Sequence, residues 1–220
     1  MSWNATVNIT GTPQGSFRSL AGYASESLAI GRAMICGYII FVKAWRDSKY
    51  DAVLDANGSL FRIEIKGTGG STTISTSSGG RTGQQINRGA GSRERPLSNA
   101  DCDWLIATTS MDGACWIIPT EIIDILQVKS ISIKNVAMCK EKWGVFIIDN
   151  PNIKPYLKCG FRQADYATLC VIAHNLGIDP TTLPLVYRLD STSTRATKYH
   201  LNQKDRLIME IWESVYRITP

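Results

Sequence analysis

Three side chains that could together act on a phosphate group lie within one short stretch of the chain. Asp51 lies in a predicted strand over residues 50–55, and Glu64 and Lys66 lie in another over residues 60–67. Side chains two apart on a strand point to the same face, so Glu64 and Lys66 share a face. Asn57-Gly58 favours a tight type I′ turn, because both positions need positive φ. The turn predicts an antiparallel pair that brings Asp51 close to Glu64 and Lys66.

Two carboxylates and one amine in one place suit the hydrolysis of a phosphodiester. Oxygen atoms of Asp51 and Glu64, with the backbone carbonyl of Ile65 and waters, make the hard site that Mg²⁺ prefers, and Mn²⁺ can substitute. Such a metal neutralises charge on a phosphate and lowers the pKa of a bound water. Lys66 can orient the attacking water and stabilise the developing charge. The alternative is a solvated strand face, which is how an acid and a lysine at this spacing usually occur.

The segments around this stretch indicate the elements that must position it. Residues 17–35 carry apolar side chains at helical spacing, and Gly37 can end that helix. The alternation and β-branched content of other segments favour strands. We expect strands over residues 38–44, 50–55, 60–67, 104–109, 114–118, 130–134 and 145–149, a protruding ribbon over 72–78, and helices over 121–127, 164–176 and 203–217.

Residues 67–96 differ in composition from the rest, because they are rich in glycine, serine, threonine and arginine. A long loop inside a compact domain is uncommon unless it is functional, although a disordered polar loop is the alternative. Arginine pairs with phosphates and guanine, and glutamine or asparagine pairs with adenine. The expected DNA contacts in this loop are Arg81, Gln84, Gln85, Asn87, Arg88, Arg93 and Arg95. Arg188, Arg195 and Lys198 form a second candidate DNA surface, for which a charged face is the alternative.

Composition excludes several other classes of protein. The 220 residues carry a net charge of +5, which permits binding to a polyanion without requiring it. The six cysteines contain no Cys-x-x-Cys pair and there are two histidines, so a zinc centre or a disulfide framework is not expected. No apolar segment approaches the roughly 20 residues of a membrane span, and no secretory signal begins the chain. We therefore expect a cytoplasmic protein that has no membrane partner.

The motif residues resemble those of the PD-(D/E)XK nuclease superfamily, which includes type II restriction endonucleases, intron homing endonucleases and Holliday-junction resolvases. Glu64-Ile65-Lys66 fits the (D/E)XK half, and Asp51 fits the first acid, with Tyr50 at the position of the namesake proline. The Ser-Lys-Tyr lead-in resembles the homing endonuclease branch. The order of helix, Gly-Tyr entry into a strand, acid-bearing strand and (D/E)XK strand is also similar. The resemblance covers residues 17–127, about half of the chain.

The resemblance implies an α/β fold with a restriction-endonuclease-like core, in which helices flank a central mixed sheet. It also implies that Glu26 on the first helix is an extra acid facing the metal, for which an exposed helix glutamate is the alternative. We expect residues 1–150 to form the catalytic core and residues 151–220 a mainly helical extension for recognition or dimerisation. The expected activity is Mg²⁺-dependent, sequence-specific cleavage of double-stranded DNA by a homodimer. The alternatives are a homing endonuclease, a junction resolvase, or a DNA-binding protein without activity.

Overall fold

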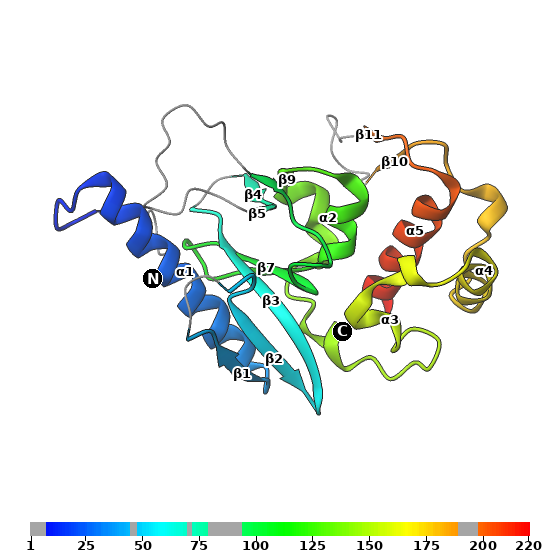
Figure 1. Cartoon of the computed structure of the whole chain (residues 1–220), viewed down its shortest axis with the longest axis horizontal. Coiled ribbons are helices and arrows are strands. Elements are labelled where there is room, and N and C mark those ends of the chain that lie inside the picture. The colour runs from blue at the N-terminus through cyan, green and yellow to red at the C-terminus, as the bar shows by residue number, and fades with distance from the viewer. Residues whose placement is uncertain (1–7, 45–47, 70–71, 79–93, 189–197) are drawn as a thin grey trace.

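A central five-stranded sheet forms the middle of the molecule (Figure 1). The computed structural model describes residues 8–44, 48–69, 72–78, 94–188 and 198–220. The sheet order is β1-β2-β3-β7-β8, and all neighbours are antiparallel except β3 and β7, which are parallel. The strands are β1 (Ile39–Val42), β2 (Ala52–Ala56), β3 (Ser59–Gly67), β7 (Trp104–Thr108) and β8 (Cys115–Pro119). The predicted α/β fold with a mixed sheet is confirmed.

The hairpin that joins β2 and β3 forms as its sequence predicts. Asn57 and Gly58 both have positive φ, 53° and 85°, as a type I′ turn requires. Asp55 accepts a hydrogen bond of 2.7 Å from the backbone N–H of Gly58, which accounts for an acid beside the turn. The register pairs Ala52 with Ile63 and Ala56 with Ser59. Asp51 therefore directly precedes β2, at the end of the hairpin opposite the turn.

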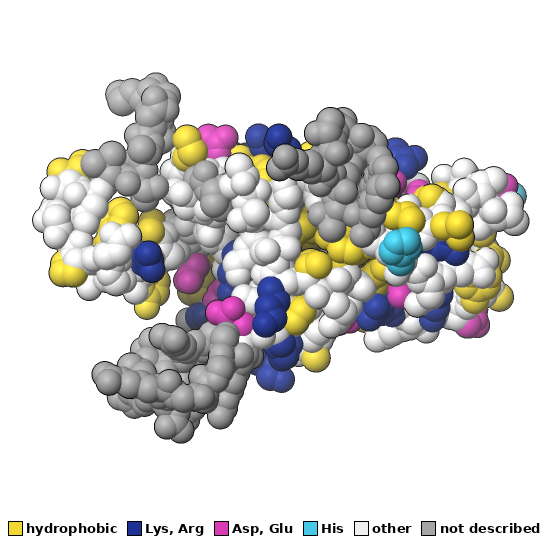
Figure 2. Space-filling model, turned by 90° about the horizontal axis from the view of Figure 1, so that it is seen from above, with side chains coloured by type: hydrophobic (Ala, Val, Ile, Leu, Met, Phe, Trp, Pro, Cys, Tyr) yellow, Lys and Arg dark blue, Asp and Glu magenta, His cyan; other side chains and the backbone are white. Residues whose placement is uncertain are grey.

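The predicted first helix is α1 (Gln14–Ile35), which contacts β1, β3 and β7. In Figure 1 it lies along one side of the sheet, while α2 and the C-terminal helices lie on the other side. Its buried residues are Ser25, Ala29 and Ala33, and such small side chains allow the helix to approach the strands closely. Other α1 side chains, including Tyr23 and Ile35, stay exposed, and Figure 2 shows hydrophobic side chains on this surface.

Two sequence predictions outside the hairpin are wrong. Residues 72–78 form no self-contained ribbon, because β4 (Thr73–Ser75) pairs with β9 (Ser130–Ser132) and β5 (Ser77–Ser78) pairs with β6 (Arg95–Pro96). Residues 145–149 form no strand, because η2 (Trp143–Ile147) is a 3₁₀ helix. Phe146 in this helix packs on three aromatic rings, those of Tyr38, Phe61 and Trp104, so tertiary packing overrides the strand propensity.

The remaining chain is mainly helical, as predicted, and packs on the same hydrophobic core as the sheet. Its elements are α2 (Thr120–Leu126), η1 (Ile133–Cys139), α3 (Tyr156–Cys159), η3 (Phe161–Gln163), α4 (Tyr166–Asn175), η4 (Pro180–Thr182), β10 (Tyr187–Arg188), β11 (Lys198–Tyr199) and α5 (Gln203–Ile218). Trp212 of α5 meets Trp104 of β7 edge to face, with ring centroids 5.5 Å apart. The division at residue 150 stays a prediction.

The cysteines lie at different depths in the structure. All six cysteines are free, and Cys102, Cys115 and Cys139 are buried like small hydrophobic residues. Trp104, Trp116 and Trp143 are buried in the core. Within the described ranges, every helix is too short or too polar to span a bilayer.

Candidate active site

Asp51 links the ends of β1, β2 and β3. Its backbone carbonyl accepts a hydrogen bond of 3.0 Å from the N–H of Lys43, and its own N–H donates to the carbonyl of Ile63 at 2.8 Å. Its carboxylate oxygen Oδ2 accepts the N–H of Ile65 at 2.8 Å. The carboxylate of Asp51 thus takes the place of a backbone carbonyl as the acceptor for Ile65 in the ladder between β2 and β3. The result is a carboxylate that is 9% exposed and fixed against the strand that carries Glu64 and Lys66.

Glu64 and Lys66 lie on one face of β3, as the strand period predicts. The side chains at 62, 64 and 66 are half-buried, and those at 61, 63 and 65 are buried. Lys66 Nζ donates to Glu64 Oε1 at 2.5 Å, and these side chains are 27% and 12% exposed. Burial raises the pKa of Glu64, Lys66 opposes that rise, and the negative charge of Asp51 adds to it. The backbone N–H of Ile65, which lies between Glu64 and Lys66, donates to Asp51, so the hairpin brings these three residues together.

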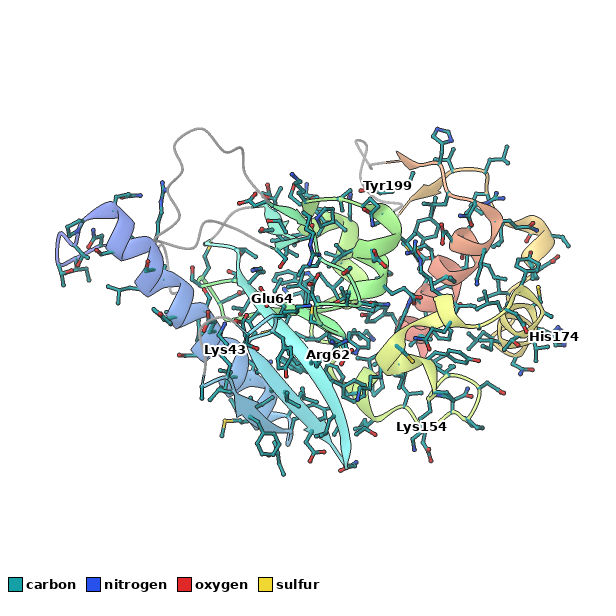
Figure 3. All side chains as sticks on the ribbon, viewed as in Figure 1. Lys43, Arg62, Glu64, Lys154, His174 and Tyr199 are labelled. Atoms are coloured by element: carbon teal, nitrogen blue, oxygen red, sulfur yellow. The ribbon has the colours of Figure 1, made fainter. Side chains whose placement is uncertain are left out.

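Lys43 is a member of this cluster that the sequence reasoning missed. It directly follows β1, and its Nζ forms an ion pair with Asp51 Oδ1. Figure 3 shows Lys43 and Glu64 close together, with Arg62 further along β3. A signal was present, because Lys43 lies next to the last residue of the predicted strand over residues 38–44, and antiparallel pairing of that strand with the next brings this end close to Asp51. Two acids and two lysines therefore form two ion pairs near the ends of three neighbouring strands.

Glu26 of α1 lies within electrostatic reach of the cluster, and its role as an acid facing a metal stays a prediction. Burial raises the pKa of Glu26, the charge of Asp51 raises it further, and Lys43 and Lys66 lower it. The neighbouring residue Ser25 packs on Gly67, the residue after Lys66. Glu26 therefore belongs to the same electrostatic environment as the hairpin acids, although no direct hydrogen bond joins it to them among the described residues.

The donor set fits a hard divalent cation held partly by water. No group of three or more His, Cys, Asp or Glu side chains gathers for a metal in the described ranges. Mg²⁺ does not need such a group, since it commonly takes one or two carboxylates and keeps several waters. Asp51, Glu64 and the carbonyl of Ile65 are the residues that would hold it. The buried hydroxyl of Thr68, two residues after Lys66, has no hydrogen-bond partner in the described part of the chain and could bind one of those waters.

Arg62 shares a face with Glu64 and Lys66 but is bound elsewhere. Its guanidinium donates to Asp103 Oδ1 at 2.6 Å and to the carbonyl of Asn99 at 2.8 Å. Asp103 also accepts the backbone N–H of Arg62 at 2.7 Å. This pair fastens β3 to the segment before β7, and leaves Lys66 and Lys43 as the cations beside the two acids.

The predicted DNA contacts are only partly within the described residues. Those outside the described ranges are Arg81, Gln84, Gln85, Asn87, Arg88, Arg93 and Arg195. Arg95 forms two hydrogen bonds with the carboxylate of Asp101, at 2.7 and 2.6 Å, so it has a structural partner. The backbones of Arg188 and Lys198 pair directly in the two-stranded sheet of β10 and β11. In the view of Figure 2, the lysines and arginines of the described residues lie at several separate places.

The chain is similar in structure to a known endonuclease but has no match among protein families or curated proteins. No protein-family model matches the sequence, and no curated protein matches it. Among solved structures, the chain is similar to a bacterial homing endonuclease, I-Ssp6803I, with a TM-score of 0.43 and 20% sequence identity. The similarity covers 52% of this chain and 76% of the homing endonuclease chain.

Proposed function

We propose that this protein is a Mg²⁺-dependent deoxyribonuclease of the PD-(D/E)XK type that hydrolyses phosphodiester bonds of double-stranded DNA. The observation that carries the proposal is the convergence of Asp51, Glu64 and Lys66 at one end of β2 and β3. Asp51 reaches β3 through the N–H of Ile65, between the two other residues of the motif. A solvated strand face would not hold three charged side chains at 9%, 12% and 27% exposure.

Each residue has a role that its surroundings support. Asp51 and Glu64, with the carbonyl of Ile65, are the proposed metal ligands. When bound, Mg²⁺ supplies charge neutralisation at the phosphate and a more acidic water. Lys66 is a point charge on a flexible stem, which suits it to hold a water or a phosphate oxygen beside Glu64. Glu26 contributes a further negative charge at the edge of the site.

The proposed substrate is a specific site in duplex DNA, and the proposed assembly is a homodimer. We propose site-specific cleavage, because the chain provides arginine, glutamine and asparagine side chains in residues 67–96 and basic residues in residues 185–201. One site per chain and two strands in duplex DNA suggest a homodimer. The proposed cation is Mg²⁺, and Mn²⁺ can replace it.

The test is cleavage of plasmid DNA with Mg²⁺, Mn²⁺ or EDTA. The wild-type protein should give discrete fragments with either metal and none with EDTA. Asp51→Asn, Glu64→Gln and Lys66→Ala should each lower the rate by at least about a hundredfold, the scale expected for one electrostatic contact to the transition state. Asp55→Asn is the matched control, because Asp55 lies on β2, four residues after Asp51, but its carboxylate binds the turn. Normal cleavage by the three site variants would overturn the proposal.

A further inference from the structure

The two carboxylate oxygens of Asp51 have different partners, and only one of those partners can leave easily. Oδ2 accepts the backbone N–H of Ile65, which belongs to the ladder between β2 and β3. Oδ1 is paired with Lys43 Nζ, at the end of a flexible side chain. Each carboxylate oxygen can accept more than one partner, but the ladder hydrogen bond holds Oδ2 against β3, whereas movement of the Lys43 side chain uncovers Oδ1. Oδ1 is therefore the oxygen that a cation reaches without disturbing the strand pairing.

Glu64 offers a contrast on the opposite side of the site. Lys66 Nζ occupies Oε1 of Glu64, and within the described ranges no hydrogen bond reaches Oε2. A cation can therefore approach Glu64 through Oε2 while Lys66 remains bound to Oε1. Access to Asp51 is different, because Lys43 Nζ is paired with Oδ1, the oxygen through which the cation would bind.

The position of Lys43 allows its side chain to move while its backbone stays. Its N–H donates to the carbonyl of Asp51 at 3.0 Å, so the backbone is part of the sheet. The side chain of Lys43 is 28% exposed, and Lys43 itself follows the last residue of β1. The ammonium group can therefore move toward solvent. Removing Lys43 from Asp51 without a replacement would leave a carboxylate that is 9% exposed without its cation, which is costly. A divalent cation supplies that replacement.

We propose that Lys43 is an exchangeable counter-ion, which neutralises Asp51 in the metal-free protein and is displaced from Oδ1 when the divalent cation binds. Lys43 is thus a positioning residue for the site, and its displacement lowers the net affinity for the metal. This inference rests on the proposed metal site. It adds that metal binding and the Lys43–Asp51 ion pair are mutually exclusive.

The first experiment uses the wild-type protein and needs no substitution. Lysine amines are modified with a small acylating reagent, with and without saturating Mn²⁺, and the modified positions are quantified by mass spectrometry. Lys43 should react at least about threefold faster with Mn²⁺, since an ammonium released from an ion pair is more accessible, and Lys49 should not change. An unchanged rate at Lys43, with Mn²⁺ bound, would overturn the inference.

The second experiment measures Mn²⁺ binding by titration calorimetry to four proteins: wild type, Lys43→Met, Lys49→Met and Asp51→Asn. Lys43→Met should bind roughly three- to tenfold more tightly than wild type, because no ion pair must be broken. Lys49→Met removes an exposed charge two residues before Asp51 and should bind like wild type. Equal or weaker binding by Lys43→Met would overturn this inference but not the proposed metal site. Wild-type affinity in Asp51→Asn would overturn the proposed metal site and the inference together.

Discussion

Gly67 and Ser25 are so close that a Cβ atom on Gly67 would lie 2.3 Å from Ser25 Oγ and 2.7 Å from Ser25 Cβ. The contact joins β3, one residue after Lys66, to α1, one residue before Glu26. Because Ser25 Cβ is fixed to the helix backbone, no rotation of the side chain can relieve such an overlap. The separation of α1 from the candidate active site is therefore set at this contact.

Gly67→Ala should push α1 away from β3. We expect a loss of about 1–3 kcal/mol of the free energy of unfolding, as is usual for overpacking of a tight interior. Urea denaturation measures the loss, and plasmid cleavage should fall with it if the position of Glu26 matters. Ser25→Gly in the Gly67→Ala background removes both clashing atoms and should restore part of the stability. No rescue would show that the Ser25 contact is not the cause.

Glu121 should be a principal link between α2 and the C-terminal helices. Its carboxylate accepts the N–H groups of Phe161 and Arg162 and the indole N–H of Trp212, at 2.8, 2.6 and 2.6 Å. Glu121→Ala leaves three donors, two of them buried, without an acceptor, so we expect a loss of about 3 kcal/mol or more. Asp124→Ala on the same helix breaks an ion pair that is partly exposed and should cost about 1 kcal/mol or less. Equal losses in the two variants, measured by urea denaturation, would contradict this role.

Asp101 should contribute to acid sensitivity. The hydrogen bond from Arg95 is the main cause that lowers the pKa of Asp101 below its ordinary value of 3.8, while burial opposes it and Ser98 supports it. A carboxyl whose pKa is lowered on folding stabilises the protein above the unfolded value, and this contribution is lost as the pH falls through the folded value. Asp101→Asn should therefore be less stable than wild type at neutral pH, and the difference should shrink below pH 3.8. Denaturation at a series of pH values tests this, and a constant difference would contradict it.

Arg188 and Lys198 are backbone partners in the two-stranded sheet of β10 and β11. We expect them to contact DNA phosphates. Arg188→Ala and Lys198→Ala should each weaken binding to all DNA sequences similarly and reduce the slope of log affinity against log salt by about one. Lys154→Ala is the control, because Lys154 pairs with Asp149 far from these strands, as Figure 3 shows. An unchanged salt slope in both variants would show that Arg188 and Lys198 do not contact DNA phosphates.

Local sequence signals predicted the parts of the fold that local physics decides. Asn57-Gly58 fixed the hairpin because its positive φ values leave few alternatives, and the period of β3 placed Glu64 and Lys66 on one face. Residues 145–149 were predicted as a strand, but the packing of Phe146 on distant rings makes them a 3₁₀ helix. Arg95 was predicted to contact DNA, yet its bidentate partner Asp101 becomes evident only once the chain is folded. Lys43 was missed because its place opposite Asp51 depends on the register between β1 and β2, which the sequence does not set.

The central claim is that Asp51 and Glu64 share one divalent cation, and anomalous diffraction from crystals soaked in Mn²⁺ tests it most directly. The account predicts an anomalous peak about 2.1 Å from Asp51 Oδ1 and from a Glu64 oxygen, with the Lys43 ammonium withdrawn from Asp51. Soaked crystals of Asp51→Asn should lack that peak. A wild-type crystal at saturating Mn²⁺ with no peak between these carboxylates, and with Lys43 still paired to Asp51, would contradict the account.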